Sequence, residues 1–301
     1  MADALRLEHV TKRFGSFTAV DDLSLAIPEA SIYGFIGPNG AGKTTTIRMI
    51  MNIFLPDEGT IEVLGRPNGE EIKNSLGYLP EEKGLYKKMR TAEIVAYFGR
   101  LKGMGAREAR TAARELLERY GLGEWADKPC EALSKGMGQK VQMLATIIHQ
   151  PRLLILDEPF SGLDPVNRDL MQEIILNMKR EGRTVIFSTH VMEQSEQICD
   201  YIFMINKGRK VLDGTLEEIK AGRGRGIMIA YDGDASFIPS LPGVRRVNDS
   251  GKTAEVFLEE GASPQDLLES LVPRLKISRF DVREPSLHEI FVRIVKEGEA
   301  A

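Results

Sequence analysis

The segment Gly37–Thr44 constrains the fold of this chain more than any other feature. Its sequence, Gly-Pro-Asn-Gly-Ala-Gly-Lys-Thr, fits the pattern G-x-x-x-x-G-K-[ST]. The run Ser31–Ile36 before it predicts a buried strand, and Thr44–Phe54 after it predicts a helix that Pro56 closes. Glycines let successive backbone N–H groups turn inward around phosphate oxygens, and the start of a helix favours negative charge. The segment therefore predicts a phosphate-binding loop between a strand and a helix.

The same pattern predicts a role for each polar residue of the loop. We expect Lys43 to reach the β- and γ-phosphates of ATP, and the hydroxyl group of Thr44 to bind Mg²⁺. ATP and Mg²⁺ are therefore the expected cofactors. The residues of this segment that we expect to bind ATP are Gly37, Pro38, Asn39, Gly40, Ala41, Gly42, Lys43, Thr44 and Thr45.

A second apolar run, Leu153–Leu156, ends in two carboxylates, Asp157 and Glu158. In a parallel sheet, an Asp at the carboxyl end of a strand lies beside the phosphate loop. We expect Asp157 to hold Mg²⁺ and Glu158 to polarise the attacking water. Two acids at a strand end can also be a solvated terminus, but their combination with Gly37–Thr44 favours the catalytic interpretation.

Hydrophobic periodicity outlines two domains of an α/β protein. Alternating or continuous apolar runs predict strands at 5–10, 17–20, 23–27 and 184–188, and helical spacing predicts helices at 106–120, 136–149 and 170–180. The flexible, basic stretch 221–226 marks a break. After it, a small α+β domain is predicted, with strands at 227–231, 245–248, 253–258 and 276–282 and helices at 264–271 and 286–295.

Composition excludes several classes of protein. The net charge of -4 argues against a nucleic-acid partner, because phosphate backbones select basic surfaces. No apolar run approaches the roughly 18 residues of a membrane span, and residues 1–6 do not resemble a signal peptide. Cys130 and Cys199 have no metal-ligand spacing and are expected to be inert thiols. We therefore expect a cytoplasmic protein.

Three further motifs carry a family resemblance. Leu133–Met137, with the sequence Leu-Ser-Lys-Gly-Met, is similar to the LSGGQ signature of the ATP-binding subunits of ABC transporters. Ser161–Asp164 resembles the D-loop of that family, and Ser188–His190 resembles the segment that carries its switch histidine. These motifs occur in the family's order, and the resemblance covers residues 4–220.

The resemblance implies a P-loop NTPase of the ABC ATPase type. Such a domain, expected here at 1–221, has a RecA-like parallel core, an antiparallel β subdomain and a helical subdomain at about 88–150. Pro285–Phe291 resembles the end of an accessory domain found in one subgroup. The expected accessory domain spans 226–301 and has a ferredoxin-like α+β fold.

The resemblance also implies how ATP is held. Two subunits close head to tail, so that Ser134, Lys135 and Gly136 of one chain complete the ATP site of the other. Glu158 resembles the general base and His190 the residue that contacts the γ-phosphate. The resemblance further implies ATP contacts for Phe14, which stacks on adenine, and for Val20 and Asp164. A buried structural histidine and a core phenylalanine are the alternatives for His190 and Phe14.

Four positions depart from the family pattern. Glu81 replaces a glutamine; a carboxylate can ligand Mg²⁺ or orient water but cannot donate an amide hydrogen bond. Lys135 replaces a glycine, and its cation can either pair with the γ-phosphate of the opposed site or face solvent. Met137 replaces a glutamine and Ala30 a glycine, and no function is assigned to either change.

These departures resemble a subgroup that serves sodium or multidrug efflux. The resemblance implies an ATPase motor subunit of an exporter, peripheral on the inner face of the membrane. Its partners would be a separately encoded polytopic permease, docking near Glu82–Arg90, and a second copy of the chain or a related ATPase subunit. The expected substrate is a sodium ion, a drug or another small molecule. The alternative is an ABC-type ATPase that acts as a nucleotide-gated binding module without a transporter.

Overall fold

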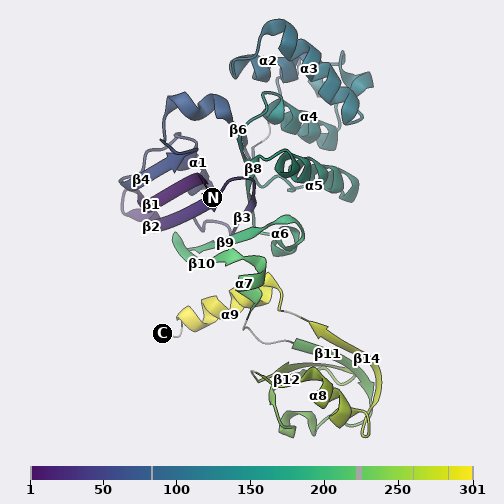
Figure 1. The fold of residues 1–301 in the computed structure, drawn as a ribbon. Coiled ribbons are helices and arrows are strands. Elements are labelled where there is room, and N and C mark those ends of the chain that lie inside the picture. The colour runs from purple at the N-terminus through teal and green to yellow at the C-terminus, as the bar shows by residue number, and fades with distance from the viewer. Residues whose placement is uncertain (1, 83, 222–225, 260, 284, 300–301) are drawn as a thin grey trace. The chain divides into compact units, whose positions relative to one another are not determined.

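The computed structural model describes residues 2–82, 84–221, 226–259, 261–283 and 285–299. The chain divides into two compact units, Met1–Gly214 and Thr215–Ala301 (Figure 1). The break expected at 221–226 comes a few residues after this division, and its residues 222–225 lie outside the described residues.

A six-stranded sheet in the order β10-β9-β3-β8-β7-β6 forms the centre of the first unit (Figure 1). The pairs β3–β8, β3–β9, β8–β7 and β7–β6 are parallel. The strands of this sheet are β3 (Ile32–Ile36), β6 (Leu76–Leu79), β7 (Leu153–Asp157), β8 (Thr184–Thr189), β9 (Tyr201–Asn206) and β10 (Arg209–Thr215).

Both faces of this sheet are covered, which is why its central strands are apolar throughout. Leu154 and Leu156 of β7 join a core with the helices α4 and α5, whereas Leu153 and Ile155 join a core with α1 and the N-terminal strands. The helices that flank the sheet are α1 (Lys43–Ile50), α4 (Lys135–Ile147), α5 (Pro165–Arg180) and α6 (Met192–Ile198). The helices α2 (Thr91–Leu101) and α3 (Ala106–Arg119) pack with α4 to form the helical subdomain.

A separate antiparallel sheet, in the order β2-β1-β4-β5, precedes and follows the phosphate loop in sequence. Its strands are β1 (Asp3–Phe14), β2 (Phe17–Pro28), β4 (Glu58–Val63) and β5 (Arg66–Pro67). The prediction of two strands at 17–20 and 23–27 was wrong, because β2 runs through both. Asp22 adopts a left-handed backbone with φ of 50°, and the pairing with β1 shifts register there without ending the strand.

The second unit has the strand order β12-β13-β11-β14, and its pairs are antiparallel. In chain order this is 2-3-1-4, the order of a ferredoxin-like sheet, so the expected fold is confirmed. Alternate residues of β11 and β13 pack against α8 in one core. The elements are α7 (Leu216–Lys220), β11 (Gly226–Asp232), β12 (Val244–Asp249), β13 (Thr253–Leu258), α8 (Pro264–Leu271), β14 (Lys276–Arg283) and α9 (Leu287–Glu299).

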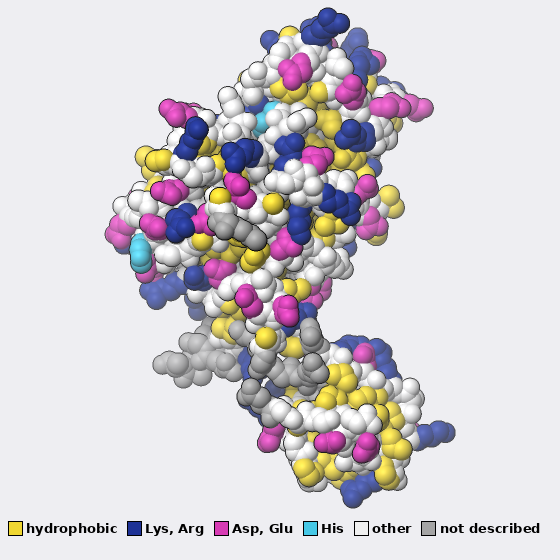
Figure 2. Space-filling view, in the orientation of Figure 1, with side chains coloured by type: hydrophobic (Ala, Val, Ile, Leu, Met, Phe, Trp, Pro, Cys, Tyr) yellow, Lys and Arg dark blue, Asp and Glu magenta, His cyan; other side chains and the backbone are white. Residues whose placement is uncertain are grey.

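Surface properties agree with the charge balance of the sequence. Acidic and basic side chains are interspersed over the visible face of the first unit (Figure 2). Among the described helices, none combines the length and the apolar character that crossing a bilayer requires.

One partly buried histidine makes the stability of the fold depend on pH. The Nε2–H group of His149 donates to the carbonyl of Leu76 at 3.0 Å, and its Nδ1 atom is buried without a partner among the described residues. Burial lowers the pKa of His149 from 6.5 to about 4. Between these two pH values the unfolded chain takes up a proton that the folded chain does not, so acidification lowers the free energy of unfolding.

We predict that His149→Gln weakens this pH dependence. The glutamine amide can donate to the same carbonyl but does not titrate, so the variant should lose less stability between pH 6.5 and 4.5 than the wild-type protein. Denaturant unfolding at several pH values measures this difference. His288→Gln, at an exposed position, is the control and should follow the wild type. Parallel pH profiles for His149→Gln and wild type would contradict the prediction.

Candidate functional site

A pocket of about 390 Å³ is lined by most of the predicted phosphate-loop residues and by five residues from elsewhere in the sequence. The predicted residues among its lining are Asn39, Gly40, Ala41, Gly42, Lys43, Thr44, Thr45, Glu81, Glu158 and His190, and Phe17 and Ala19 line it as well. The structure therefore brings together residues that are more than 100 positions apart in the chain.

The loop approaches neighbouring backbone too closely for a side chain at two of its glycines. A Cβ atom on Gly37 would lie 2.2 Å from the carbonyl oxygen of Ile205, and one on Gly42 would lie 2.6 Å from that of Ala19. Gly42 also has a φ of 109°, which side chains disfavour. Gly40 has a left-handed φ of 77° as well, but a Cβ there would meet no atom within 4 Å. The loop is thus pressed against the neighbouring backbone on one side and open on the other.

Lys43 is a buried cation at the first position of α1. Its ammonium group donates to the carbonyls of Gly37 at 2.7 Å and Pro38 at 3.2 Å, and lies 3.9 Å from the carboxylate of Glu158. Burial lowers the pKa of Lys43, while the nearby carboxylates oppose that shift. The ammonium group of Lys43 therefore lies at the phosphate loop, where it is expected to contact the phosphates.

Asp157 lies at the carboxyl end of β7 with only 2% of its surface exposed. The hydroxyl group of Ser188 donates to its Oδ1 atom at 2.5 Å, and that of Thr44 lies 3.4 Å from the same atom. Ser188 also accepts the backbone N–H of Glu158 at 3.0 Å. A single buried serine therefore holds both acidic residues.

Glu158 has a strained backbone, with a φ of 50° in the left-handed region. Its side chain is 9% exposed, and its Oε1 atom lies 3.0 Å from Nδ1 of His190. His190 itself is 49% exposed, so it is not the buried structural histidine of the alternative interpretation. The turn directs the carboxylate of Glu158 into the pocket, between a lysine and a histidine.

Oxygen atoms in and beside the pocket suit a hard divalent cation. The hydroxyl group of Thr44 and the carboxylate of Asp157 are neighbours, and Glu81 lines the same pocket. Mg²⁺ prefers such oxygen ligands and usually keeps several waters. The residues present therefore fit Mg²⁺ beside a phosphate-binding loop.

The two predicted adenine contacts do not line the pocket. The ring of Phe14 packs edge-on against Phe54 at 5.5 Å, and Val20 is fully buried in the core with α1. Phe17, which is 62% exposed, lines the pocket instead. Sequence reasoning missed Phe17 and Ser188. The signal for Phe17 is an aromatic residue at the start of β2. The signal for Ser188 is a serine at the carboxyl end of β8.

The signature and D-loop residues lie at two helix starts, and they are not among the residues that line this pocket. Ser134 is the N-cap of α4 and accepts the backbone N–H of Met137 at 3.3 Å. Asp164 is the N-cap of α5 and accepts that of Asn167 at 2.9 Å. Lys135 and Gly136 form the first turn of α4.

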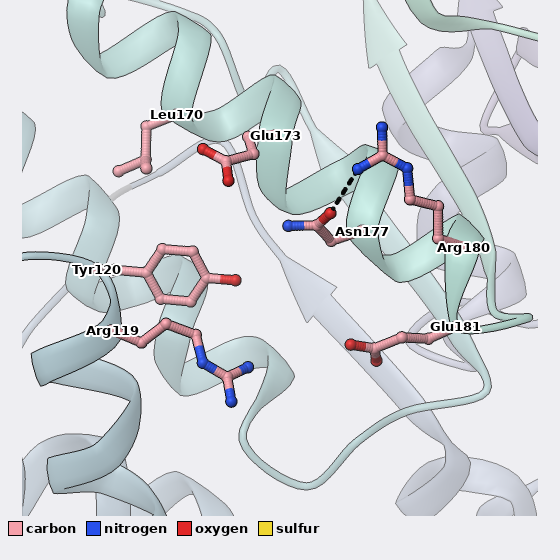
Figure 3. A pocket seen from close by; sticks show the side chains of 7 residues that line it. All are labelled: Arg119, Tyr120, Leu170, Glu173, Asn177, Arg180 and Glu181. Carbon is pink, nitrogen blue, oxygen red and sulfur yellow. Dashed lines mark hydrogen bonds between the residues drawn. The ribbon is translucent and has the colours of Figure 1, made fainter.

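A second pocket, of about 270 Å³, lies between the end of α3 and the helix α5 (Figure 3). Arg119 and Arg180 line it together with Glu173 and Glu181, so cations and carboxylates are balanced there. It has neither a glycine loop nor a buried lysine, and we do not assign it to the nucleotide.

We predict that Ser188→Ala weakens Mg²⁺ binding by about 10-fold, since residues that orient metal ligands typically contribute that much. The variant loses the hydrogen bond to Asp157 and leaves the N–H of Glu158 without its hydroxyl acceptor. Titration of Mg²⁺ in a nucleotide-binding assay measures the effect. Ser31→Ala, at a buried serine before β3, is the control, and equal Mg²⁺ affinities for the two variants would contradict the prediction.

Two family models match the sequence. The model of the ABC transporter family matches residues 20–161, and the model of the "ATP-binding protein DrrA1-3-like, C-terminal domain" matches residues 214–295. The accessory domain expected from Pro285–Phe291 is thereby confirmed.

Relatives and solved structures agree with these matches. An uncharacterized ABC transporter ATP-binding protein of Bacillus subtilis, YhaQ, is 42% identical over 97% of this chain and 98% of its own length. The Nod factor export ATP-binding protein I of Sinorhizobium fredii is 34% identical over 97% of this chain and 85% of its own length. The linearmycin resistance ATP-binding protein LnrL of Bacillus subtilis is 31% identical over 96% of this chain and 97% of its own length. A solved ATP-binding subunit of an ABC transporter superposes with a TM-score of 0.67 at 29% identity, covering 72% of this chain and 92% of that one. The chain thus belongs to the ATP-binding subunits of ABC transporters.

Proposed function

We propose that this chain is the ATP-hydrolysing motor subunit of an ABC exporter. The observation that carries the proposal is the carboxylate of Glu158, held in the pocket between Lys43 at 3.9 Å and His190 at 3.0 Å. A carboxylate so placed can accept the proton of a water molecule that attacks a γ-phosphate on the neighbouring loop. Names of relatives in Nod factor export and linearmycin resistance support the direction of transport.

Each group around Glu158 then has a distinct task. Lys43 neutralises charge on the β- and γ-phosphates, and the backbone of the Gly37–Thr44 loop binds their oxygens. His190 orients the carboxylate and contacts the γ-phosphate. Mg²⁺, when bound through Thr44, Asp157 and Glu81, would neutralise phosphate charge. Glu81 adds a second carboxylate, beside that of Glu158, to the lining of the pocket.

Hydrolysis is proposed to need two chains. Ser134 caps a 13-residue helix whose first backbone N–H groups favour an anion, and this helix start is outside the pocket formed by the chain's own loop. Head-to-tail pairing with a second copy or a related subunit would bring Ser134, Lys135 and Gly136 to the opposed ATP. Closure of this kind excludes water and strengthens the electrostatic interactions in the site.

An apolar groove supports the expected partner, a separately encoded polytopic permease. It has a volume of about 460 Å³ and is lined by Tyr86, Lys87, Lys88, Met89 and Tyr97. The ring of Tyr86 is 59% exposed and meets that of Tyr97 edge-on at 6.1 Å. Exposed aromatics of this kind often anchor a partner.

We propose that a cytoplasmic segment of the permease docks in this groove, which would bring the chain to the inner face of the membrane. The cargo would be a sodium ion, a drug or another small molecule.

We predict that Glu158→Gln lowers ATP turnover at least about 100-fold, because the amide cannot accept the proton of the attacking water. ATP binding should persist, since the amide preserves the size of the side chain. Steady-state phosphate release with the permease present gives the turnover, and Glu193→Gln, at an exposed position of α6, is the control. Wild-type turnover in the Glu158→Gln variant would remove Glu158 from its catalytic role.

We also predict that Tyr86→Ala combined with Tyr97→Ala weakens association with the permease about 10-fold or more, as loss of aromatic anchors typically does. Co-purification from membranes, followed by mass spectrometry, identifies and quantifies the polytopic partner. Leu55→Ala, at a side chain that is 69% exposed in the segment after α1, is the matched control. If the wild-type chain captured no membrane protein, the result would favour the alternative function, a nucleotide-gated binding module that acts without a transporter.

A further inference from the structure

The start of α4 contacts the loop that follows Glu158. The Nε2 atom of Gln139 donates to the carbonyl of Ser161 at 3.1 Å. Nearer the start of the helix, a Cβ atom on Gly162 would lie 2.9 Å from the ammonium nitrogen of Lys135. The signature helix and the D-loop of one chain are therefore in direct contact.

The same loop is tied to Glu158. The backbone N–H of Ser161 donates to the carbonyl of Glu158 at 3.1 Å, closing a turn. The carbonyl of Ser161 accepts from Gln139, so one residue of the loop connects Gln139 with Glu158. A displacement of α4 would be transmitted along this connection to the backbone that carries the catalytic carboxylate.

Gln139 is the buried member of this contact. It is 4% exposed, whereas Lys135, Ser161 and Gly162 are exposed. Its amide oxygen is buried and has no hydrogen-bond partner among the described residues, so its hydrogen-bonding capacity is only partly used. Rotating the amide would place that oxygen against the carbonyl of Ser161, which fixes the assignment of its two atoms. Burying an amide costs free energy that an apolar residue of similar size avoids, and its hydrogen bond to Ser161 is the interaction that offsets this cost.

We propose that Gln139 is a positioning residue, which couples the signature helix to the general base through the carbonyl of Ser161. The inference rests on the proposed function, because it assigns Gln139 a task in the hydrolysis that Glu158 carries out. Gln139 does not line the nucleotide pocket, and it acts through the loop that connects Glu158 with α5.

The test replaces Gln139 by Leu, which keeps the volume and removes the donor. Hydrogen exchange of the full chain, followed by mass spectrometry, should show faster exchange in peptides that cover residues 159–164. With the permease present, kcat should fall about 10-fold, because small displacements of catalytic groups have effects of this size or larger. KM for ATP should stay unchanged, since the phosphate loop is intact. Gln172→Leu is the matched control, because its amide donates at 3.0 Å to Gln197 of α6, away from the loop.

Two results would overturn the proposal. Unchanged exchange at 159–164 in Gln139→Leu would show that the hydrogen bond does not hold the loop. Faster exchange throughout the first unit, with a lower denaturation midpoint, would show that Gln139 serves general packing. The exchange measurement needs no hydrolysis, so it remains decisive even if Glu158→Gln keeps wild-type turnover and the proposed function fails.

Discussion

The parallel pairing of β3, β8 and β7 is the constraint on which the site depends. Ile36 pairs with Thr189, and Asp157 pairs with Ser188, so the three strands end at the same level. The phosphate loop follows the first strand, His190 the second and Glu158 the third. Because the strands are buried on both faces, a shift in register would move whole rows of apolar side chains and is therefore strongly disfavoured. The arrangement of the catalytic groups follows from the packing of the sheet.

The catalytic groups carry opposite charges and have little contact with solvent. Lys43 and Asp157 are buried, and Glu158 is 9% exposed. Burial penalises each charge, and mutual attraction together with the hydrogen bonds of Ser188 and the loop carbonyls offsets the penalty. Groups held in this way need little reorganisation when charge develops during a reaction, which is the usual basis of electrostatic catalysis.

Local patterns were sufficient to predict the outline of the fold. The loop Gly37–Thr44 and the strand before Asp157 are contiguous signals, and α8 was predicted with its observed bounds because its apolar spacing is uninterrupted. The strand β2 was divided in error, since a single left-handed residue within a strand resembles a turn in sequence. Contacts between distant residues escaped prediction for a different reason. The two hydrogen bonds of Ser188 depend on the register of two strands, and that of Gln139 depends on the placement of a helix, neither of which periodicity specifies.

The close approach of Gly37 to Ile205 and of Gly42 to Ala19 has a consequence for how this domain can vary. The atoms nearest to a Cβ at either glycine are carbonyl oxygens, which every amino acid supplies, and the side chain of Ile205 lies 3.2 Å from a Cβ on Gly42. The course of the backbone at positions 19 and 205 therefore sets the space around the loop, and the buried side chain of Ile205 adds a contact that a substitution there would change. An insertion or deletion in the turn between β9 and β10 would displace the backbone that lies against the loop. The length of these strands therefore constrains the phosphate loop as directly as the glycines of the loop do.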